Sequence, residues 1–168
     1  MNKNLTFAHI EYSITTRSID IFTSGCDGNC VGCCNPEIKS WDLEGFATPQ
    51  VISKVLALNT KFDRLIDKFI IVGGDPVDAY KHYPNEFARF LSELRMMGKP
   101  IYLFTRYELP EIDRTLFYYV DYIKTGAYIP DLKCEDNTQM GIKLATSNQK
   151  IFDVSEILHN LAKECQEA

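Results

Sequence analysis

The sequence predicts an α/β fold, specifically a partial, open β/α barrel with a largely parallel sheet and about five or six βα units. Short apolar segments alternate along the chain with amphipathic helical segments, which is the pattern of a parallel sheet covered by helices. The 168 residues are too few for a complete barrel, which takes roughly 250 residues. No repeat or linker divides the chain, so residues 1–168 are expected to form one domain.

The N-terminal part is predicted to hold two strands and a long loop. Residues 7–14 mix apolar and polar side chains, and residues 18–23 alternate between them, as in a half-buried strand. The second strand leads directly into Ser24, Gly25 and Cys26. From there to about residue 46 the chain is rich in Gly, Asn, Asp and Cys, which is typical of a loop.

A helix and a buried strand are predicted next. Thr48 is expected to cap the helix, with Pro49 at its first position, and the helix continues to about residue 59. Residues 68–72 form a compact apolar strand of the kind that is buried on both faces of a sheet. This strand ends at the turn Gly73-Gly74-Asp75-Pro76.

The rest of the chain continues the alternation of strands and helices. Its predicted segments are, in order, a helix over 84–97 ended by Gly98, a strand over 101–105, a helical stretch within 108–119, a strand over 122–124, a polar loop over 131–143 and a helix over 155–164 capped by Asp153 or Ser155.

Two unusual loops thus follow predicted strands directly. Cys26 comes after the strand over 18–23, and the Gly73-Gly74-Asp75-Pro76 turn comes after the strand over 68–72. In open α/β sheets, sites gather at the C-terminal ends of the strands. The sequence therefore predicts that both loops belong to one shared site.

The overall charge excludes some classes of partner. The net charge is −5 and basic residues are scattered among acidic ones, so the sequence has no basic footprint for a nucleic acid. No apolar run approaches the ~20 residues of a membrane helix, and the polar N-terminus does not resemble a secretory signal. We therefore expect a cytoplasmic protein that binds neither nucleic acid nor a membrane.

The cysteines carry the chemical signal. Four of the six cysteines lie in one short loop, in the pattern Cys26-x3-Cys30-x2-Cys33 followed at once by Cys34. Short spacings let one loop supply several thiolate ligands to an iron–sulfur cluster, and neighbouring glycines allow the tight turns that this requires. Three ligands would leave one iron of a [4Fe–4S] cluster open for chemistry.

Two other interpretations of the cysteines compete with this one. Structural zinc prefers four closed ligands, commonly from two separated Cys-x2-Cys pairs, and that arrangement is missing. Ordinary buried thiols would not gather in a polar, glycine-rich loop. Cys34 is expected to lie near the site without binding the cluster, and Cys134 and Cys165 are expected to be bystanders.

These motifs resemble the radical S-adenosylmethionine superfamily. More closely, several segments are similar to the activating proteins of anaerobic (class III) ribonucleoside-triphosphate reductases. The similar segments lie between about Arg17 and Gln149 and are Ser24-Gly25-Cys26, Gly32-Cys33-Cys34-Asn35, Trp41, Gly73-Gly74-Asp75-Pro76, Gly126-Ala127-Tyr128, Asp131-Leu132-Lys133 and Ser147-Asn148-Gln149.

The sequence also departs from the pattern of that family. Ile14-Thr15-Thr16-Arg17 stands where the family usually has Gly-Pro-Gly-x-Arg, and Cys34 replaces an aromatic residue or histidine. Thr125 replaces the Asp of an Asp-Gly pair, and Leu144 replaces an arginine.

The resemblance implies a radical enzyme that activates a glycyl-radical enzyme. Cys26, Cys30 and Cys33 would hold a [4Fe–4S] cluster, which would cleave S-adenosylmethionine reductively. Gly73, Gly74, Asp75 and Pro76 would bind the methionine part of S-adenosylmethionine, and Ser147 and Asn148 would contact its adenosine part. The expected partners are a large anaerobic ribonucleotide reductase, whose glycine would lose a hydrogen atom, and a flavodoxin or ferredoxin as reductant.

Two further functions remain open from the sequence. One is a small radical S-adenosylmethionine enzyme that acts on a metabolite or peptide, similar to 7-carboxy-7-deazaguanine synthase. The other is a non-enzymatic zinc or iron–sulfur module that organises a complex.

Overall fold

A mixed seven-stranded sheet forms the centre of the computed structural model, which describes residues 4–167 and side chains as far as residue 163. In sheet order the strands are β3 (Phe46–Ala47), β1 (Thr6–Ser13), β2 (Ser18–Thr23), β4 (Lys68–Gly73), β5 (Ile101–Phe104), β6 (Tyr122–Thr125) and β9 (Lys150–Asp153). Strands β2, β4, β5 and β6 are parallel, whereas β1, β3 and β9 extend the sheet with antiparallel pairings.

The sheet holds fewer βα units than the sequence predicts. Four strands are parallel, and the chain after β6 does not add another βα unit. Instead it forms a small hairpin of β7 (Thr138–Gln139) and β8 (Ile142–Lys143), and then returns as β9 beside β6. The prediction of about five or six units was too high, because these terminal segments pair as antiparallel strands.

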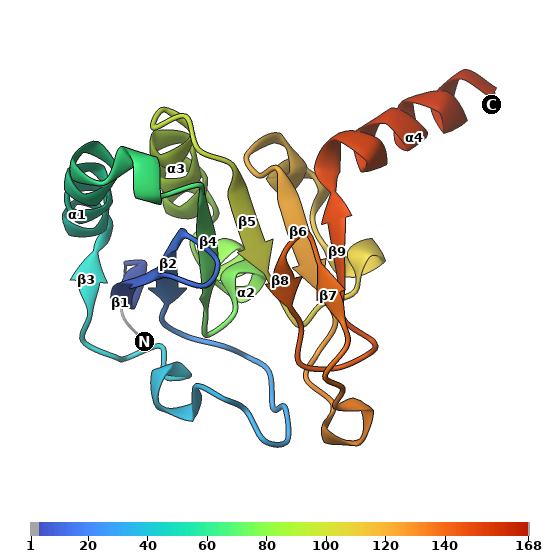
Figure 1. Ribbon diagram of the computed structural model, residues 1–168, viewed down its shortest axis with the longest axis horizontal. Helices are drawn as coiled ribbons and strands as arrows, with labels where there is room; N and C mark the ends of the chain where they lie inside the picture. The colour runs from blue at the N-terminus through green and yellow to red at the C-terminus, as the bar shows by residue number, and fades with distance from the viewer. Residues whose placement is uncertain (1–3, 168) are drawn as a thin grey trace.

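Helices cover one face of the sheet. These are α1 (Thr48–Lys61), α2 (Pro76–His82) and α3 (Pro84–Arg95), while α4 (Val154–Glu167) leaves the sheet and projects from the molecule (Figure 1). Alternate residues of the strands, such as Phe69 and Ile71 of β4, point into the large core beneath these helices. Phe87, Phe90, Leu91 and Leu94 of α3 are wholly buried there, as its predicted apolar stripe requires.

The opposite face carries a much smaller apolar cluster. Ile70 of β4 and Tyr102 of β5 pack there with Ile142 and Leu144, which come from the segment after β6. In Figure 1 this segment, with β7 and β8, lies in front of β6, on the side opposite α2 and α3. It covers only part of the face, so an open space remains beside it.

Local structure differs from the sequence prediction at several points. Thr48 does not cap α1, because its hydroxyl donates to Glu86 (3.0 Å); the residue before the helix is Ala47. Helix α2, which starts at Pro76 directly after the glycine turn, was not predicted from the sequence. Short 3-10 helices occur at η1 (Pro36–Ile38), η2 (Asp63–Leu65), η3 (Leu109–Glu111), η4 (Arg114–Tyr118) and η5 (Pro130–Leu132).

Other predictions are confirmed. Strands β1, β2, β4, β5 and β6 lie where they were expected, and α3 ends shortly before Gly98, whose φ of 74° is the left-handed conformation that favours glycine. Asp153 caps α4 by accepting a hydrogen bond from the Ser155 peptide (2.8 Å). Among the described helices, none combines the length and apolar character needed to cross a membrane.

Candidate metal centre

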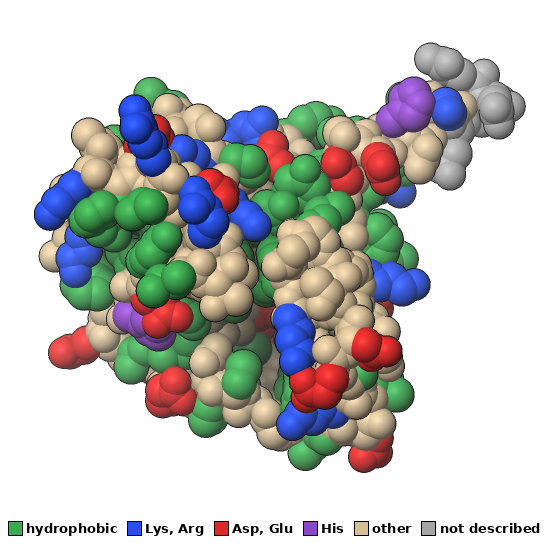
Figure 2. Space-filling model, viewed as in Figure 1, with side chains coloured by type: hydrophobic (Ala, Val, Ile, Leu, Met, Phe, Trp, Pro, Cys, Tyr) green, Lys and Arg blue, Asp and Glu red, His purple; other side chains and the backbone are tan. Residues whose placement is uncertain are grey.

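The four clustered cysteines line one cavity at the C-terminal edge of the parallel strands. The cavity has a volume of about 270 Å³, and Cys26, Cys30, Cys33 and Cys34 all contribute to its wall. Gly73, Gly74 and Asp75 form another part of the wall, and the ends of β5 and β6 close it from the other side. Figure 2 shows this face of the molecule hollowed between the part built on β1, β2 and β4 and the part that includes β6 to β9.

The cysteine loop and the glycine turn are bonded to each other through their backbones. The Gly74 peptide donates to the Thr23 carbonyl (2.8 Å), and the Asp75 peptide donates to the Gly25 carbonyl (3.0 Å). A Cβ atom on Gly74 would lie 2.0 Å from the Gly25 oxygen, and one on Gly73, whose φ is 115°, would lie 2.6 Å from the Thr23 backbone. The glycines are therefore needed for the close approach of the two loops.

The first turn of the cysteine loop is held by Trp41 and His82. A Cβ atom on Gly25 would lie 2.1 Å from the Trp41 ring, so the indole packs directly on the residue before Cys26. The indole N–H donates to one oxygen of Asp27 (2.8 Å), and the His82 ring lies 2.8 Å from the other. Although burial acts in the opposite direction, these hydrogen bonds lower the pKa of Asp27.

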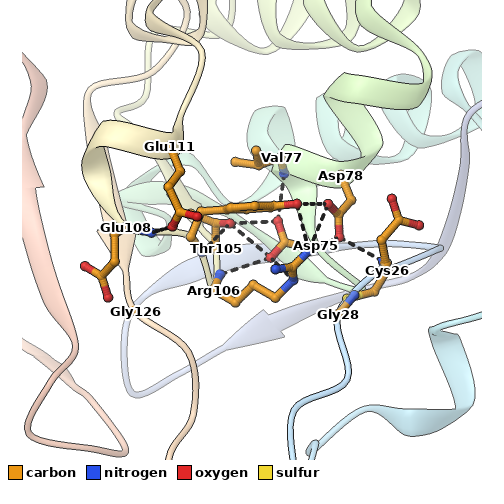
Figure 3. A network of polar contacts seen from close by, with 12 residues as sticks. Cys26, Gly28, Asp75, Val77, Asp78, Thr105, Arg106, Glu108, Glu111 and Gly126 are labelled. Carbon is orange, nitrogen blue, oxygen red and sulfur yellow. Dashed lines mark hydrogen bonds and ion pairs between the residues drawn. The ribbon is translucent and has the colours of Figure 1, made fainter.

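Asp75 connects the glycine turn to the end of β5. Its carboxylate caps α2 by accepting from the Val77 peptide (2.9 Å). It also accepts from the Thr105 hydroxyl (2.7 Å) and from the Arg106 peptide (3.0 Å), as Figure 3 shows. The side chain is 2 % exposed, and burial raises the pKa of Asp75 against the opposing effect of these donors. Its carboxylate oxygens are thus already bonded within the protein.

Asp78 is the centre of a second buried network, also drawn in Figure 3. Its carboxylate accepts hydrogen bonds from the Arg106 guanidinium (3.1 and 3.2 Å), the Tyr107 hydroxyl (2.6 Å) and the Asp27 peptide (2.9 Å). The Arg106 side chain passes so close to Gly28 that a Cβ atom there would lie 2.4 Å from Nε. The charge of Asp78 raises the pKa of Arg106 although burial opposes it.

The surroundings of Cys26 favour the protonated thiol over the thiolate. Burial is the main cause that raises its pKa, and the charges of Asp75 and Asp78 add to the effect. The Gly28 peptide, 3.2 Å from the sulfur, acts in the opposite direction. Because metals bind thiolates, occupation of the cavity by a metal would release this proton.

The cavity fits a cluster. Within the described part of the chain, no three Cys, His, Asp or Glu side chains converge as ligands of a single metal ion. Each thiolate of an iron–sulfur cluster binds its own iron, so its ligands need to surround a shared space rather than one point. Cys26, Cys30, Cys33 and Cys34 all line the same cavity, so each of them lies where a ligand of such a cluster could be placed.

Comparison with known families agrees with this geometry. The family model described as a 4Fe-4S single cluster domain matches residues 16–152, which is more than half of the chain. The chain belongs to the 4Fe-4S single cluster domain family. This membership supports one [4Fe–4S] cluster as the cofactor. It is also compatible with the activity of an iron–sulfur oxidoreductase. A comparison with curated proteins found no match.

Several residues singled out in the sequence do not line this cavity. Ser147 and Asn148 are not among its lining residues, and the Asn148 amide donates to the Ala127 carbonyl (3.0 Å) instead. Arg17 forms an ion pair with Asp67 (2.7 Å) at the surface. Cys134 is also outside the lining, and the side chain of Cys165 is outside the described region.

Arg106 and Lys124 of the cavity wall were not predicted from the sequence, whereas Gln149 belongs to the Ser147-Asn148-Gln149 segment that the resemblance singled out. Arg106 and Lys124 come from the ends of β5 and β6, and Gln149 lies just before β9. Gln149 is buried and accepts from the Ala145 peptide (3.0 Å), so it orders the segment that covers the cavity. Arg106 and Lys124 lie directly at or after the ends of predicted strands. Because sites gather at the C-terminal ends of parallel strands, this position could have identified them as residues of the site.

Proposed function

We propose that this protein is a radical S-adenosylmethionine enzyme that activates an anaerobic ribonucleoside-triphosphate reductase by generating a glycyl radical on it. The observation that carries the proposal is the shared cavity, in which the cysteine triplet of a single-cluster domain faces a Gly-Gly-Asp-Pro turn. The four parallel strands that end at this cavity support the partial β/α barrel expected of such an enzyme.

Cys26, Cys30 and Cys33 would hold the cluster, and Cys34 would lie beside it. A bound [4Fe–4S] cluster with one open iron supplies an electron for the reductive cleavage of S-adenosylmethionine to a 5′-deoxyadenosyl radical. The protein contributes binding, orientation and exclusion of water. The hydrogen bonds between the cysteine loop and the glycine turn would keep the cluster and the bound ligand in a fixed relation.

The glycine turn would bind the methionine part of S-adenosylmethionine through its peptide groups. Gly73 and Gly74 lie in the cavity wall, whereas the Asp75 carboxylate is occupied by Val77, Thr105 and Arg106. Asp75 would therefore act mainly by fixing the shape of the turn. Pro76 begins α2 and would do the same. Ser147 and Asn148 would act on the adenosine part through the position of the 126–128 segment.

The partner proteins follow from this activity. A glycyl radical on a large reductase requires access of a peptide segment to the cavity, and the open mouth beside the cysteine loop would admit one. Val31 at the tip of that loop is 77 % exposed and would meet the partner first. A flavodoxin or ferredoxin would supply the electron, and the reaction would take place in the cytoplasm.

The first test is anaerobic reconstitution with iron and sulfide, followed by reduction with dithionite and an assay for 5′-deoxyadenosine from S-adenosylmethionine. We expect product from the wild type and from Cys134→Ala, and none from Cys26→Ala, Cys30→Ala or Cys33→Ala. Zinc bound in place of iron, with no product, would refute the proposal.

A second test addresses the partner. Mixing the reduced protein with an anaerobic ribonucleotide reductase should give a glycine-centred radical detectable by electron paramagnetic resonance. Formation of 5′-deoxyadenosine without such a radical, but with turnover of a metabolite or peptide, would instead support the small-molecule enzyme.

A further inference from the structure

Lys124 is a buried lysine in the wall of the cysteine cavity. It lies on β6, where its neighbours in the sheet are Phe104 of β5 and Ile151 of β9. Phe104 and Leu144 line the same cavity as Lys124, so this part of the cavity wall is largely apolar. The residue is 9 % exposed. Such a position in a strand is ordinarily apolar, which makes a charged residue there unusual.

The ammonium group is incompletely bonded within the described structure. It donates to the Gly126 carbonyl (2.8 Å) and, more weakly, to the Thr105 carbonyl (3.5 Å). An ammonium group has three N–H donors, so one is left over. Among the residues that the structure describes, no carboxylate forms an ion pair with Lys124. A buried, charged donor without an anionic partner is unfavourable unless a ligand supplies that partner.

The amine of Lys124 keeps its positive charge at neutral pH and can therefore bind an anion. Asp75, Cys34, Cys30 and Glu108 partly offset the burial that lowers its pKa to about 8, so the amine is mostly protonated at neutral pH. The Asp75 carboxylate is occupied by its own donors, as described above.

The other cations of the cavity wall are differently placed. Arg106 is paired with Asp78, and Lys143 is paired with Glu135. Lys39, on the cysteine-loop side, is more exposed than Lys124. Among these cations, Lys124 is therefore the one for which an anionic ligand in the cavity would most reduce the unfavourable free energy of a buried charge.

We propose that Lys124 binds the carboxylate of the amino-acid part of S-adenosylmethionine and thereby determines specificity for that ligand. The inference rests on the proposed function. The inference is supported by the position of Lys124, a cationic donor in the same cavity wall as the cysteines and the glycine turn. A charge-assisted hydrogen bond in this partly enclosed cavity would be stronger than the same contact at the surface.

The test compares two ligands that differ only in the carboxylate. Binding of S-adenosylmethionine and of decarboxylated S-adenosylmethionine to the reconstituted protein is measured by anaerobic equilibrium dialysis. Lys124→Met keeps the apolar stem and removes the charge, and Lys150→Met removes an exposed charge from the adjacent strand β9. Iron content and the visible spectrum of the cluster establish that each variant is folded and loaded, and Lys124→Gln replaces the methionine variant if that one does not fold.

We expect Lys124→Met to weaken binding of S-adenosylmethionine by roughly 10- to 100-fold, the range of a hydrogen bond to a charged group, and to leave binding of the decarboxylated ligand nearly unchanged. Lys150→Met should change neither. Equal weakening of both ligands, or of neither, would overturn the role of Lys124 while leaving the proposed function intact. If the loaded wild type bound no S-adenosylmethionine, the proposed function itself would fail.

Discussion

The buried carboxylate of Asp78 accepts a hydrogen bond from the peptide N–H of Asp27, with 2.9 Å between the nitrogen and Oδ2. This bond connects α2 to the residue that follows Cys26, the first cysteine of the triplet. The same carboxylate holds Arg106, which lies against Gly28, the next residue of the loop. Asp78 thus fixes two successive residues of the cysteine loop directly after Cys26.

Asp78→Asn should destabilise the protein by about 3 kcal/mol, because it removes the nearer anionic partner of the partly buried Arg106 guanidinium and leaves only Asp75, whose carboxylate lies 3.8 Å from Nε. The amide oxygen can still accept from the Asp27 peptide, so the shape of the loop is expected to survive. The free energy of unfolding in urea measures the effect. Asp131→Asn, at an exposed position, is the matched control and should change stability by less than about 0.5 kcal/mol. Equal stability of the two variants would contradict the role assigned to Asp78.

Gly74→Ala should separate the two loops of the cavity. The added methyl group would lie 2.0 Å from the Gly25 oxygen, and moving the backbone to relieve this contact should cost about 3 kcal/mol or more. The matched control is Gly98→Ala, where nothing lies within 4 Å but the positive φ is unfavourable for alanine by roughly 1–2 kcal/mol. Iron bound per chain after reconstitution should fall in Gly74→Ala and stay at the wild-type level in Gly98→Ala. Full iron loading of both variants would show that the contact does not matter for the site.

The single tryptophan should report on assembly of the metal centre. Trp41 packs on Gly25 and donates to Asp27, on either side of Cys26. Iron–sulfur clusters absorb where tryptophan emits, so reconstitution with iron and sulfide should quench its fluorescence strongly. Cys26→Ala treated in the same way should keep its emission. Quenching that persisted in this variant would mean that the cluster is assembled elsewhere.

The burial of Lys124 predicts a specific pH dependence of stability. Its pKa is about 8 in the folded protein against 10.5 ordinarily, so between these values the unfolded chain binds more protons than the folded one. The free energy of unfolding contributed by this group therefore rises as the pH increases from about 8 to 10.5, by about 3 kcal/mol in total.

Lys124→Met should lack this rise. The difference in unfolding free energy between the wild type and the variant is compared at pH 7 and at pH 10 in urea, before cluster reconstitution. At pH 7 the variant should be the more stable of the two, and its advantage should shrink at pH 10. A difference that does not change with pH would contradict the buried, shifted amine.

Much of the sheet and the position of the cysteine loop could be predicted from the sequence. Strands such as β4 carry continuous apolar runs, and the alternation in β2 follows the two faces of the sheet. The meeting of the cysteine loop with the glycine turn followed from the rule that parallel strands end at one edge, and the structure confirms it through the Gly74 and Asp75 peptides.

Other features depend on contacts that no local pattern encodes. Threonine is a common helix-capping residue, yet the hydroxyl of Thr48 donates a hydrogen bond to Glu86 on another helix. The resemblance gave Gly73 and Gly74 a role in binding S-adenosylmethionine, but their close approach to the backbone of Thr23 and Gly25 could be seen only in the structure. Lys124 and Arg106 were missed because a single cation at a strand end is common, and its burial is decided by the fold.

The division of the sheet into two faces separates folding from chemistry. The large core lies beneath α1, α2 and α3, while the cysteine cavity opens on the thinly covered opposite face. Substitutions on the cavity face that spare the Gly25–Gly74 contact and the hydrogen bonds of Asp75 and Asp78 should therefore change which molecule reaches the metal centre more than they change the large core.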